Sequence, residues 1–245
     1  MSAPGSIEVD VGGDRLVLRA SRSAYWAGGA TLMAADLHLG KPAAFAAVGV
    51  AVPSAVTEAD LDRLSRDIEE TGARRVVILG DLFHARRGQV EHTLSALSAW
   101  RARHARVEVL LVRGNHDQRA GDPPEALGIR TLDEPVADGP WVFTHGHGGG
   151  KAASSVAAGR EGHVLGGHVH PVVRLIGPGG SRARHACFVV GARRTILPAY
   201  GTFTGGAAAE PEPGDRVFAV HGEEIAEVRV AAVPARTVLG RRRGR

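Results

Sequence analysis

The fold is decided by residues 76–117, which read VVILGDLFHARRGQVEHTLSALSAWRARHARVEVLLVRGNHD. The apolar runs at 76–79 and 107–112 have the length of buried strands, and each is followed by glycine and polar residues. A helix is predicted between them, at 90–104. Strand, helix and strand in this order predict a right-handed crossover in a parallel sheet, whose ligands gather at the carboxyl ends of the strands.

The same alternation extends toward the N-terminus. Residues 30–35 are a predicted buried strand that ends at Asp36, and residues 54–71 are a predicted helix that Gly72 stops. Residues 7–18 alternate apolar and polar side chains around a Gly-Gly-Asp turn, which predicts a β-hairpin.

After Pro135 the sequence becomes rich in short strands. Candidate strands lie at 142–144, 164–166, 172–176, 188–190, 195–197 and 217–220. A second sheet packed on the first accounts for them, so the predicted fold class is α/β, with two packed mixed β-sheets flanked by helices. We expect a single domain over residues 1–240 and a basic, disordered tail over residues 241–245.

Composition narrows the classes of function. The chain has 245 residues, of which 44% are hydrophobic and 23% are charged, as is typical of a globular domain. Its single cysteine, Cys187, excludes an intramolecular disulfide and a cysteine-rich zinc site, which favours a cytoplasmic location. Four arginines at 241–245 account for the whole net charge of +4, so charge alone does not indicate a nucleic-acid partner. We expect neither a signal peptide nor a membrane span.

Five polar clusters stand at or near the predicted strand ends, and they contain only oxygen and imidazole donors. They are Asp36-Leu37-His38, Gly80-Asp81, Gly114-Asn115-His116-Asp117, Thr144-His145 and Gly167-His168-Val169-His170. In an extended backbone, residues two apart point to the same side, so the first and last clusters should each aim two donors at a cation. Donors without thiolate suit Mn, Fe, Zn or Ni, and more than four donors favour two ions.

These clusters resemble the motifs of the calcineurin-like metallophosphoesterases, D-x-H, G-D, G-N-H-D, a lone histidine and G-H-x-H, in that order. The strings ADLHLGK at 35–41, GDLFHAR at 80–86, GHVHP at 167–171 and LPAYGTFTG at 197–205 are similar to those of the ligase-associated DNA damage response endonucleases. The resemblance implies a four-layer αββα sandwich that hydrolyses phosphodiesters with two divalent metal ions, Mn²⁺ being expected and Fe, Zn and Ni the alternatives. It also implies DNA as substrate, a role in DNA repair, and an ATP-dependent DNA ligase and a helicase as partners.

Carried onto this chain, the resemblance implies a role for nine residues. One ion would be held by Asp36, His38 and His170, the other by Asn115, His145 and His168, and Asp81 would bridge them. His116 would protonate the leaving alkoxide, and Asp117 would orient the His116 ring.

Alternatives remain open for several features. His84 stands where many members of the superfamily have an acidic residue, so we expect it behind the ligands or facing the substrate. His147 is the alternative to His145 as a ligand, and residues 146–162 are expected to form a mobile loop over the metal site. The alternative substrate is a small nucleotide or phosphomonoester. The alternative function is that of a non-catalytic repair partner whose metals are structural.

Overall fold

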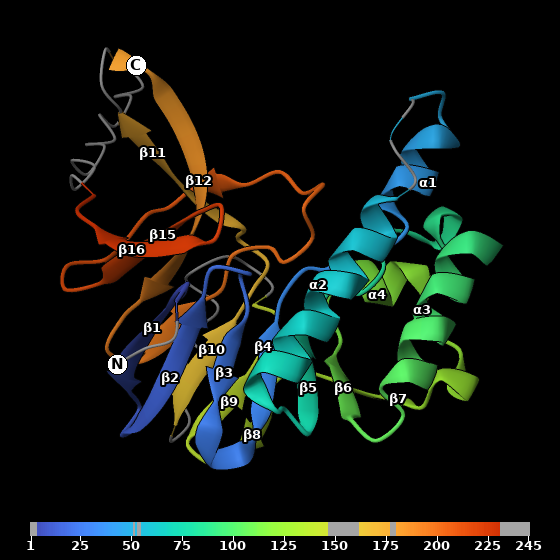
Figure 1. The fold of residues 1–245 in the computed structure, drawn as a ribbon, viewed down its shortest axis with the longest axis horizontal. Helices are drawn as coiled ribbons and strands as arrows, with labels where there is room; N and C mark the ends of the chain where they lie inside the picture. The colour runs from blue at the N-terminus through green and yellow to red at the C-terminus, as the bar shows by residue number, and fades with distance from the viewer. Residues whose placement is uncertain (1–3, 51, 53–54, 147–161, 177–179, 231–245) are drawn as a thin grey trace, which may run out of the picture.

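The computed structural model describes residues 4–50, 52, 55–146, 162–176 and 180–230, and it contains two packed β-sheets (Figure 1). The first sheet has seven strands in the order β1-β2-β3-β4-β5-β6-β7. They are β1 (Ser6–Val11), β2 (Asp14–Arg19), β3 (Ala24–Trp26), β4 (Thr31–Ala34), β5 (Arg75–Leu79), β6 (Glu108–Val112) and β7 (Ile129–Leu132). Because β4 to β7 pair in parallel, the carboxyl ends of β4, β5 and β6 lie side by side.

The second sheet has nine strands, seven of them in the order β14-β11-β12-β13-β10-β9-β8, with β15 paired to β12 and β16 to β15. They are β8 (Val136–Asp138), β9 (Trp141–Phe143), β10 (His163–Gly166), β11 (Pro171–Ile176), β12 (Arg182–Val190), β13 (Arg194–Ile196), β14 (Ala207–Ala208), β15 (Arg216–His221) and β16 (Glu224–Val228). Strand β10 pairs in parallel with both β9 and β13. The carboxyl ends of β9 and β10 are therefore also adjacent.

The main core fills the space between the two sheets, where apolar faces from both meet. It includes Val77 and Leu79 from the first sheet and Phe143, Leu165 and Phe188 from the second, all fully buried. Successive side chains of a strand point to opposite faces of its sheet, so every second side chain enters the core between the two sheets. The packing fixes one sheet relative to the other and so aligns their carboxyl ends.

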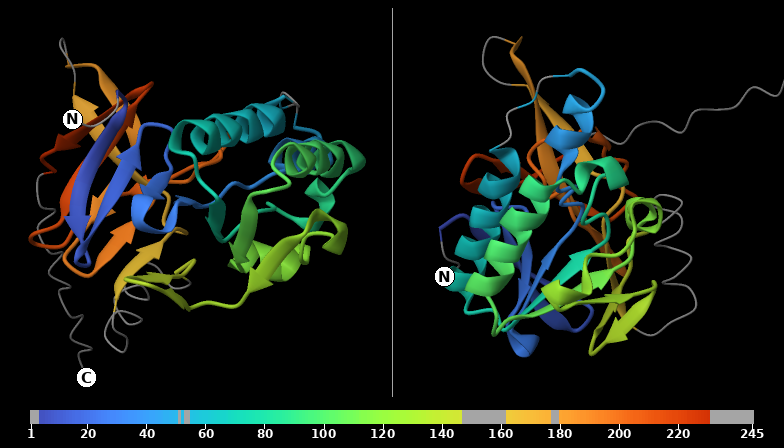
Figure 2. Two further views of the ribbon diagram at one scale, coloured as in Figure 1. Left: turned by 60° about the horizontal axis from the view of Figure 1, so that its bottom comes forward. Right: turned by 90° about the vertical axis from the view of Figure 1, so that its right-hand side faces the viewer.

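Helices cover the outer face of the first sheet (Figure 2). They are α2 (Val56–Thr71) and α3 (Glu91–Arg103), and two short helices, α1 (Lys41–Ala46) and α4 (Asn115–Ala120), lie in the loops after β4 and β6. Leu64 of α2 and Trp100 of α3 belong to the apolar cluster that these helices share with the sheet. Among the described residues, no helix covers the outer face of the second sheet, which carries an apolar cluster of its own around Cys187 and Val217.

The predicted α/β fold with two mixed sheets and helices is confirmed. The hairpin, the three N-terminal buried strands and both long helices occur where they were predicted. The elements that the sequence pattern did not indicate are short pieces such as β3, β7, β14, α1 and α4, which span two to six residues and show too little periodicity. Cys187 is fully buried, and burial raises the pKa of its thiol to about 12, so it is an inert core residue.

Two predicted segments lie almost wholly outside the described residues. These are the loop at 146–162, of which only Gly146 and Gly162 are described, and the tail at 241–245. No helix among the described residues combines the length and the hydrophobicity that crossing a membrane requires.

Candidate metal centre

The predicted ligands lie in five loops that leave the carboxyl ends of strands in both sheets. They are Asp36 and His38 after β4, Asp81 after β5, Asn115 after β6, His145 after β9, and His168 and His170 after β10. The first two loops are joined by main-chain hydrogen bonds, in which Asp36 N–H donates to Gly80 O at 3.1 Å and His38 N–H donates to Asp81 O at 2.8 Å. Packing of the two sheets thus brings all seven side chains into one cluster.

Five of these residues have a left-handed backbone conformation. The φ angles are +57° at Asp36, +49° at His38, +54° at Asp81, +68° at His168 and +47° at His170. This conformation costs an L-residue roughly 1–2 kcal/mol, and it is found where function requires it. The expectation of extended backbone in the first and last clusters is therefore wrong, although their side chains converge. The turn at each residue, and not the two-residue period of a strand, aims the donors inward.

The first group of donors consists of Asp36, His38 and His170, whose ligand atoms lie within 4.8 Å of one another. His170 Nε2 lies 3.2 Å from Asp36 Oδ1 and 3.4 Å from His38 Nε2. His170 Nδ1 donates a hydrogen bond to Gly205 O at 3.1 Å, so the neutral ring presents a lone pair at Nε2. Burial lowers the pKa of His170, but its hydrogen bond to Asp36 and the charge of Asp36 raise it overall, so either a proton on Nε2 or a metal ion can offset the repulsion between these atoms.

The second group consists of Asn115, His145 and His168. His145 Nε2 lies 3.0 Å from Asn115 Oδ1 and 3.0 Å from His168 Nδ1. His145 Nδ1 lies 3.1 Å from the carbonyl oxygen of Leu79, to which it donates, so Nε2 is again the lone-pair atom of the neutral ring. In the second group, as in the first, a ring nitrogen with a lone pair thus lies close to other ligand atoms.

Asp81 lies between the two groups. Its Oδ2 is 3.8 Å from His38 Nε2 in the first group, and its Oδ1 is 3.5 Å from His145 Nε2 in the second. Each carboxylate oxygen therefore faces a different group, so Asp81 could bridge ions held by the two groups. Burial raises the pKa of Asp81, and the charge of Asp36 raises it further. A cation beside Asp81 would favour the ionised carboxylate instead.

The floor of the cluster is buried, and its polar atoms fit divalent cations. Asp36, His38, Asp81 and His145 are between 0% and 4% exposed. Among the described residues, no hydrogen-bond partner reaches Asp36 Oδ1. Burial, together with the charge of His170, lowers the pKa of His38 to about 2, which keeps its imidazole neutral and able to bind a metal. When bound, such ions polarise phosphoryl oxygens and acidify water.

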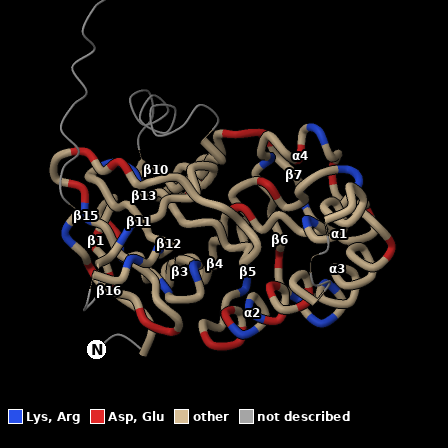
Figure 3. The backbone as a smooth tube through the Cα atoms, turned by 90° about the horizontal axis from the view of Figure 1, so that it is seen from above, with Lys and Arg blue, Asp and Glu red and all other residues tan. Residues whose placement is uncertain are grey.

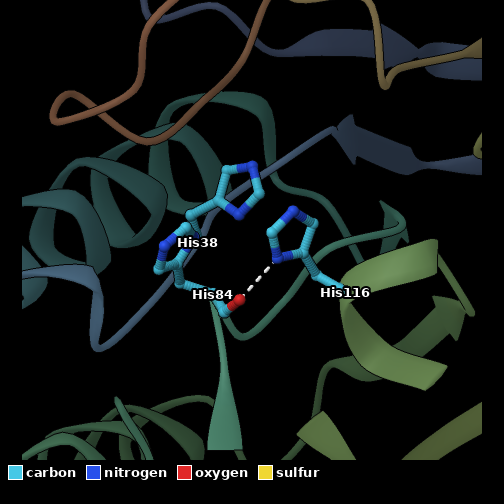
Figure 4. A group of neighbouring side chains, drawn as sticks. All are labelled: His38, His84 and His116. Carbon is cyan, nitrogen blue, oxygen red and sulfur yellow. Dashed lines mark hydrogen bonds between the residues drawn. The ribbon is translucent and has the colours of Figure 1, made fainter. Parts of the chain in front are cut away.

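His116 and His84 stand beside the donors (Figure 4). His116 Nδ1 donates a hydrogen bond to the main-chain oxygen of His84, so Nε2 is the atom left to hold or release a proton. His116 Nε2 lies 4.0 Å from Asp81 Oδ2, and its side chain is 30% exposed, so a substrate can reach it. The His84 ring stacks on the His116 ring with centroids 5.1 Å apart. The ligand atoms of His38, His84 and His116 lie within 4.8 Å of one another, so these three residues form a further group that could hold a metal ion, and the place of His84 behind the ligands or facing the substrate stays a prediction.

Asp117 does not orient the His116 ring, which corrects the role implied by the resemblance. Its carboxylate is buried and accepts main-chain N–H groups from Asp81 at 2.7 Å and Gly114 at 2.9 Å, with Phe83 at 3.4 Å. Asp117 is the third residue of α4, where a carboxylate binds the free N–H groups of a helix start. It therefore positions the loop that carries Asp81, whereas the His84 carbonyl orients His116.

Known proteins share this arrangement of sequence and structure. Residues 31–149 match the family model described as "Calcineurin-like phosphoesterase". The crystal structure of Pseudomonas putida nuclease MPE is 35% identical, with a TM-score of 0.75, over 91% of this chain and 100% of that chain. The chain belongs to the calcineurin-like phosphoesterase family. It is accordingly a metal-dependent phosphoesterase, a hydrolase of ester bonds, as the sequence predicted.

Two further solved structures match this phosphoesterase at lower identity. YfcE, a phosphoesterase from E. coli, is 16% identical with a TM-score of 0.41, over 81% of this chain and 97% of that chain. Vps29 from Entamoeba histolytica, in complex with Zn²⁺, is 16% identical with a TM-score of 0.37, over 82% of this chain and 97% of that chain. A search of curated protein sequences finds no match.

The phosphoesterase also contains supporting residues that its sequence did not reveal. Glu134 accepts the N–H of His145 at 2.6 Å, and Gly205 accepts the ring N–H of His170. No motif surrounds Glu134, whereas Gly205 ends the string LPAYGTFTG, whose similarity to one subfamily was the available signal. His147 lies outside the described residues, and the metal ligation of all seven donors stays a prediction.

Proposed function

We propose that this phosphoesterase is a nuclease that hydrolyses phosphodiester bonds of DNA. The observation that supports the proposal most directly is its 35% identity to the Pseudomonas putida nuclease along 100% of that chain. The match also covers 91% of this chain, with a TM-score of 0.75. The nuclease activity is that of the relative, and its transfer to this chain is the proposal.

The exposed rim that the described residues form around the site supports a polymeric substrate. The donors Asn115, His168 and His170 and the proton donor His116 are all partly exposed, whereas the remaining donors form the buried floor. A phosphodiester inside a long strand has chain on both sides, so it can bind only at a site with an open rim. A deep, enclosed pocket would favour a small ester instead.

Attraction for the phosphodiester would arise at the metal centre itself. Positions of basic and acidic residues are interspersed along the described chain in the view of Figure 3. Two divalent cations would bring four positive charges against the two negative charges of Asp36 and Asp81, which leaves a positive site for an anionic substrate. His116 would then protonate the leaving oxygen from Nε2.

We further propose Mn²⁺ as the metal, one of the ions that carboxylate, amide and imidazole donors bind, with Fe, Zn and Ni as the alternatives. The strings at 35–41, 80–86 and 197–205 support a cytoplasmic role in DNA repair beside an ATP-dependent DNA ligase and a helicase. Pull-down and calorimetry with the purified ligase test that role, because they measure whether the ligase binds this protein.

Nicking of supercoiled plasmid by the Mn²⁺-loaded protein tests the proposed activity. We expect nicked and linear products, cleavage of a single-stranded oligonucleotide, and much slower turnover of p-nitrophenyl phosphate and cyclic nucleotides. Asp81→Asn is the control for a contaminating nuclease, because it should abolish all cleavage. Efficient turnover of the small esters with intact plasmid would contradict the proposal and favour the small-substrate alternative.

A further inference from the structure

The loop at 197–205, LPAYGTFTG, has no role in the chemistry described above, yet it is tied to the metal centre. Tyr200 N–H donates to Ala35 O at 2.7 Å, and Gly201 N–H donates to Asp36 O at 3.2 Å. At its other end, Gly205 O accepts the ring N–H of His170. The loop is therefore held by the backbone after β4 and by the His170 side chain after β10, the two places that carry the first group of donors.

Phe203 lies in this loop and is 39% exposed, which makes it one of five exposed large apolar side chains among the described residues. Its ring packs edge-on against Phe45 of α1, with centroids 5.7 Å apart and planes at 84°. Lys41 Nζ lies 5.8 Å from the centre of the Phe203 ring. We call Phe45 and Phe203 together the aromatic shelf. The two rings are held in place by their mutual contact and lie beside a cation. Because Phe203 is partly exposed, a ligand can contact its ring.

The aromatic shelf continues into a pocket of about 340 Å³. Phe45 lines this pocket together with Ala44, Val48, His84, Ala85 and Arg87. His84 separates the pocket from the catalytic centre, because its ring is 6.0 Å from Phe45 on one side and 5.1 Å from His116 on the other. The His84 ring therefore lies between the pocket and His116, the proposed proton donor.

Two cations, Lys41 and Arg87, lie at the shelf and pocket. Among the described residues, neither Lys41 nor Arg87 forms an ion pair. Two free cations beside apolar rings match a ligand that combines a flat π-system with negative charge. A nucleotide has both, since its base lies one sugar away from its phosphate. An apolar peptide would use the rings but would leave both cations unused.

We propose that the aromatic shelf and its pocket bind the nucleobase next to the scissile phosphodiester. The inference rests on the proposed nuclease function and adds a subsite to it. The base stacks on Phe203 and Phe45, while Lys41 and Arg87 contact the neighbouring backbone phosphate. Stacking is tolerant of sequence, because every base has a π-face, so this subsite accepts any base.

A short oligonucleotide with one cleavable linkage tests the subsite. All its linkages are neutral methylphosphonates except one central phosphodiester, and three forms are compared: the intact form and two forms that lack the base on the 5′ or the 3′ side of that phosphodiester. Phe203→Ala should raise KM for the intact form roughly tenfold, and Phe203→Trp should restore it. One of the two abasic forms lacks the base that the shelf binds. On that form, wild type and Phe203→Ala should have equal KM values.

A matched control and the metal content separate this result from misfolding. Ile176→Ala removes another apolar side chain, 71% exposed on β11, and should change no KM value. Bound Mn²⁺ should be the same in wild type and in both Phe203 variants. An equal KM increase on all three forms, or no increase on any, would overturn the subsite while leaving the nuclease function standing. If the wild type hydrolyses bis-p-nitrophenyl phosphate but cleaves no DNA at all, the proposed function fails and the subsite fails with it.

Discussion

His116 offers the sharpest test of the proposed chemistry, through His116→Ala. The His84 carbonyl holds the Nδ1 proton, so the ring can deliver only the proton on Nε2, which faces the metal centre. General acid catalysis is worth about 10²- to 10⁴-fold. Because the His116 side chain is 30% exposed, water can replace part of its action, and we expect the lower half of that range. A loss of about 10²- to 10³-fold in kcat corresponds to roughly 3–4 kcal/mol in the barrier.

The assay compares two leaving groups. An internucleotide linkage of DNA leaves as a poor alkoxide that needs the proton, whereas bis-p-nitrophenyl phosphate leaves as a stable phenolate that hardly does. His116→Ala should therefore show the full loss on DNA and a loss of less than about tenfold on the aryl ester. Bound metal, measured by elemental analysis, should be unchanged.

Asp117→Asn is the matched comparison, because it changes the next residue through a different mechanism. The new amide group would point N–H groups at main-chain donors of Asp81 or Phe83 and so lose hydrogen bonds worth about 2–3 kcal/mol. It should weaken metal binding and reduce turnover of both substrates alike. If His116→Ala instead loses a metal ion, or loses equal activity on both substrates, His116 is a ligand or a phosphate-positioning group and the assignment is refuted.

Three further predictions follow from the same geometry. Asp81→Asn should weaken both metal sites at once, which titration with Mn²⁺ would show as loss of two ions; retention of one ion at full affinity would contradict bridging. Gly114→Ala should abolish metal binding, because a Cβ there would lie 2.3 Å from Asp81 Oδ1, whereas Gly205→Ala meets open space and should retain it. Burial lowers the pKa of His163 to about 4, so the folded state binds fewer protons than the unfolded chain, and stability should fall by about 3 kcal/mol as pH drops from 6.5 to 4. Chemical denaturation of His163→Gln should show a smaller loss over this range than wild type.

The sequence alone was enough for the elements and donors that depend on local pattern. The apolar runs of β5 and β6 and the helix between them predicted a parallel sheet, and the residues after each strand were predicted to meet at one edge. That prediction succeeded because a parallel sheet places every carboxyl end on the same side, whatever the details of the loops. The type of each donor, oxygen or imidazole, is likewise a property of the sequence.

The tertiary structure decided which partner each group has and how each donor is aimed. Asp117 is adjacent to His116 in the chain, yet it binds the main chain of Asp81, 36 residues away, and the His84 carbonyl takes its place at the ring. Phe203 reaches Phe45 across even more of the chain. A local pattern records which residues are apolar, charged or able to turn. It does not record how closely two loops approach after the sheets pack, and hydrogen bonds and ring contacts, which act over a few ångströms, depend on that approach.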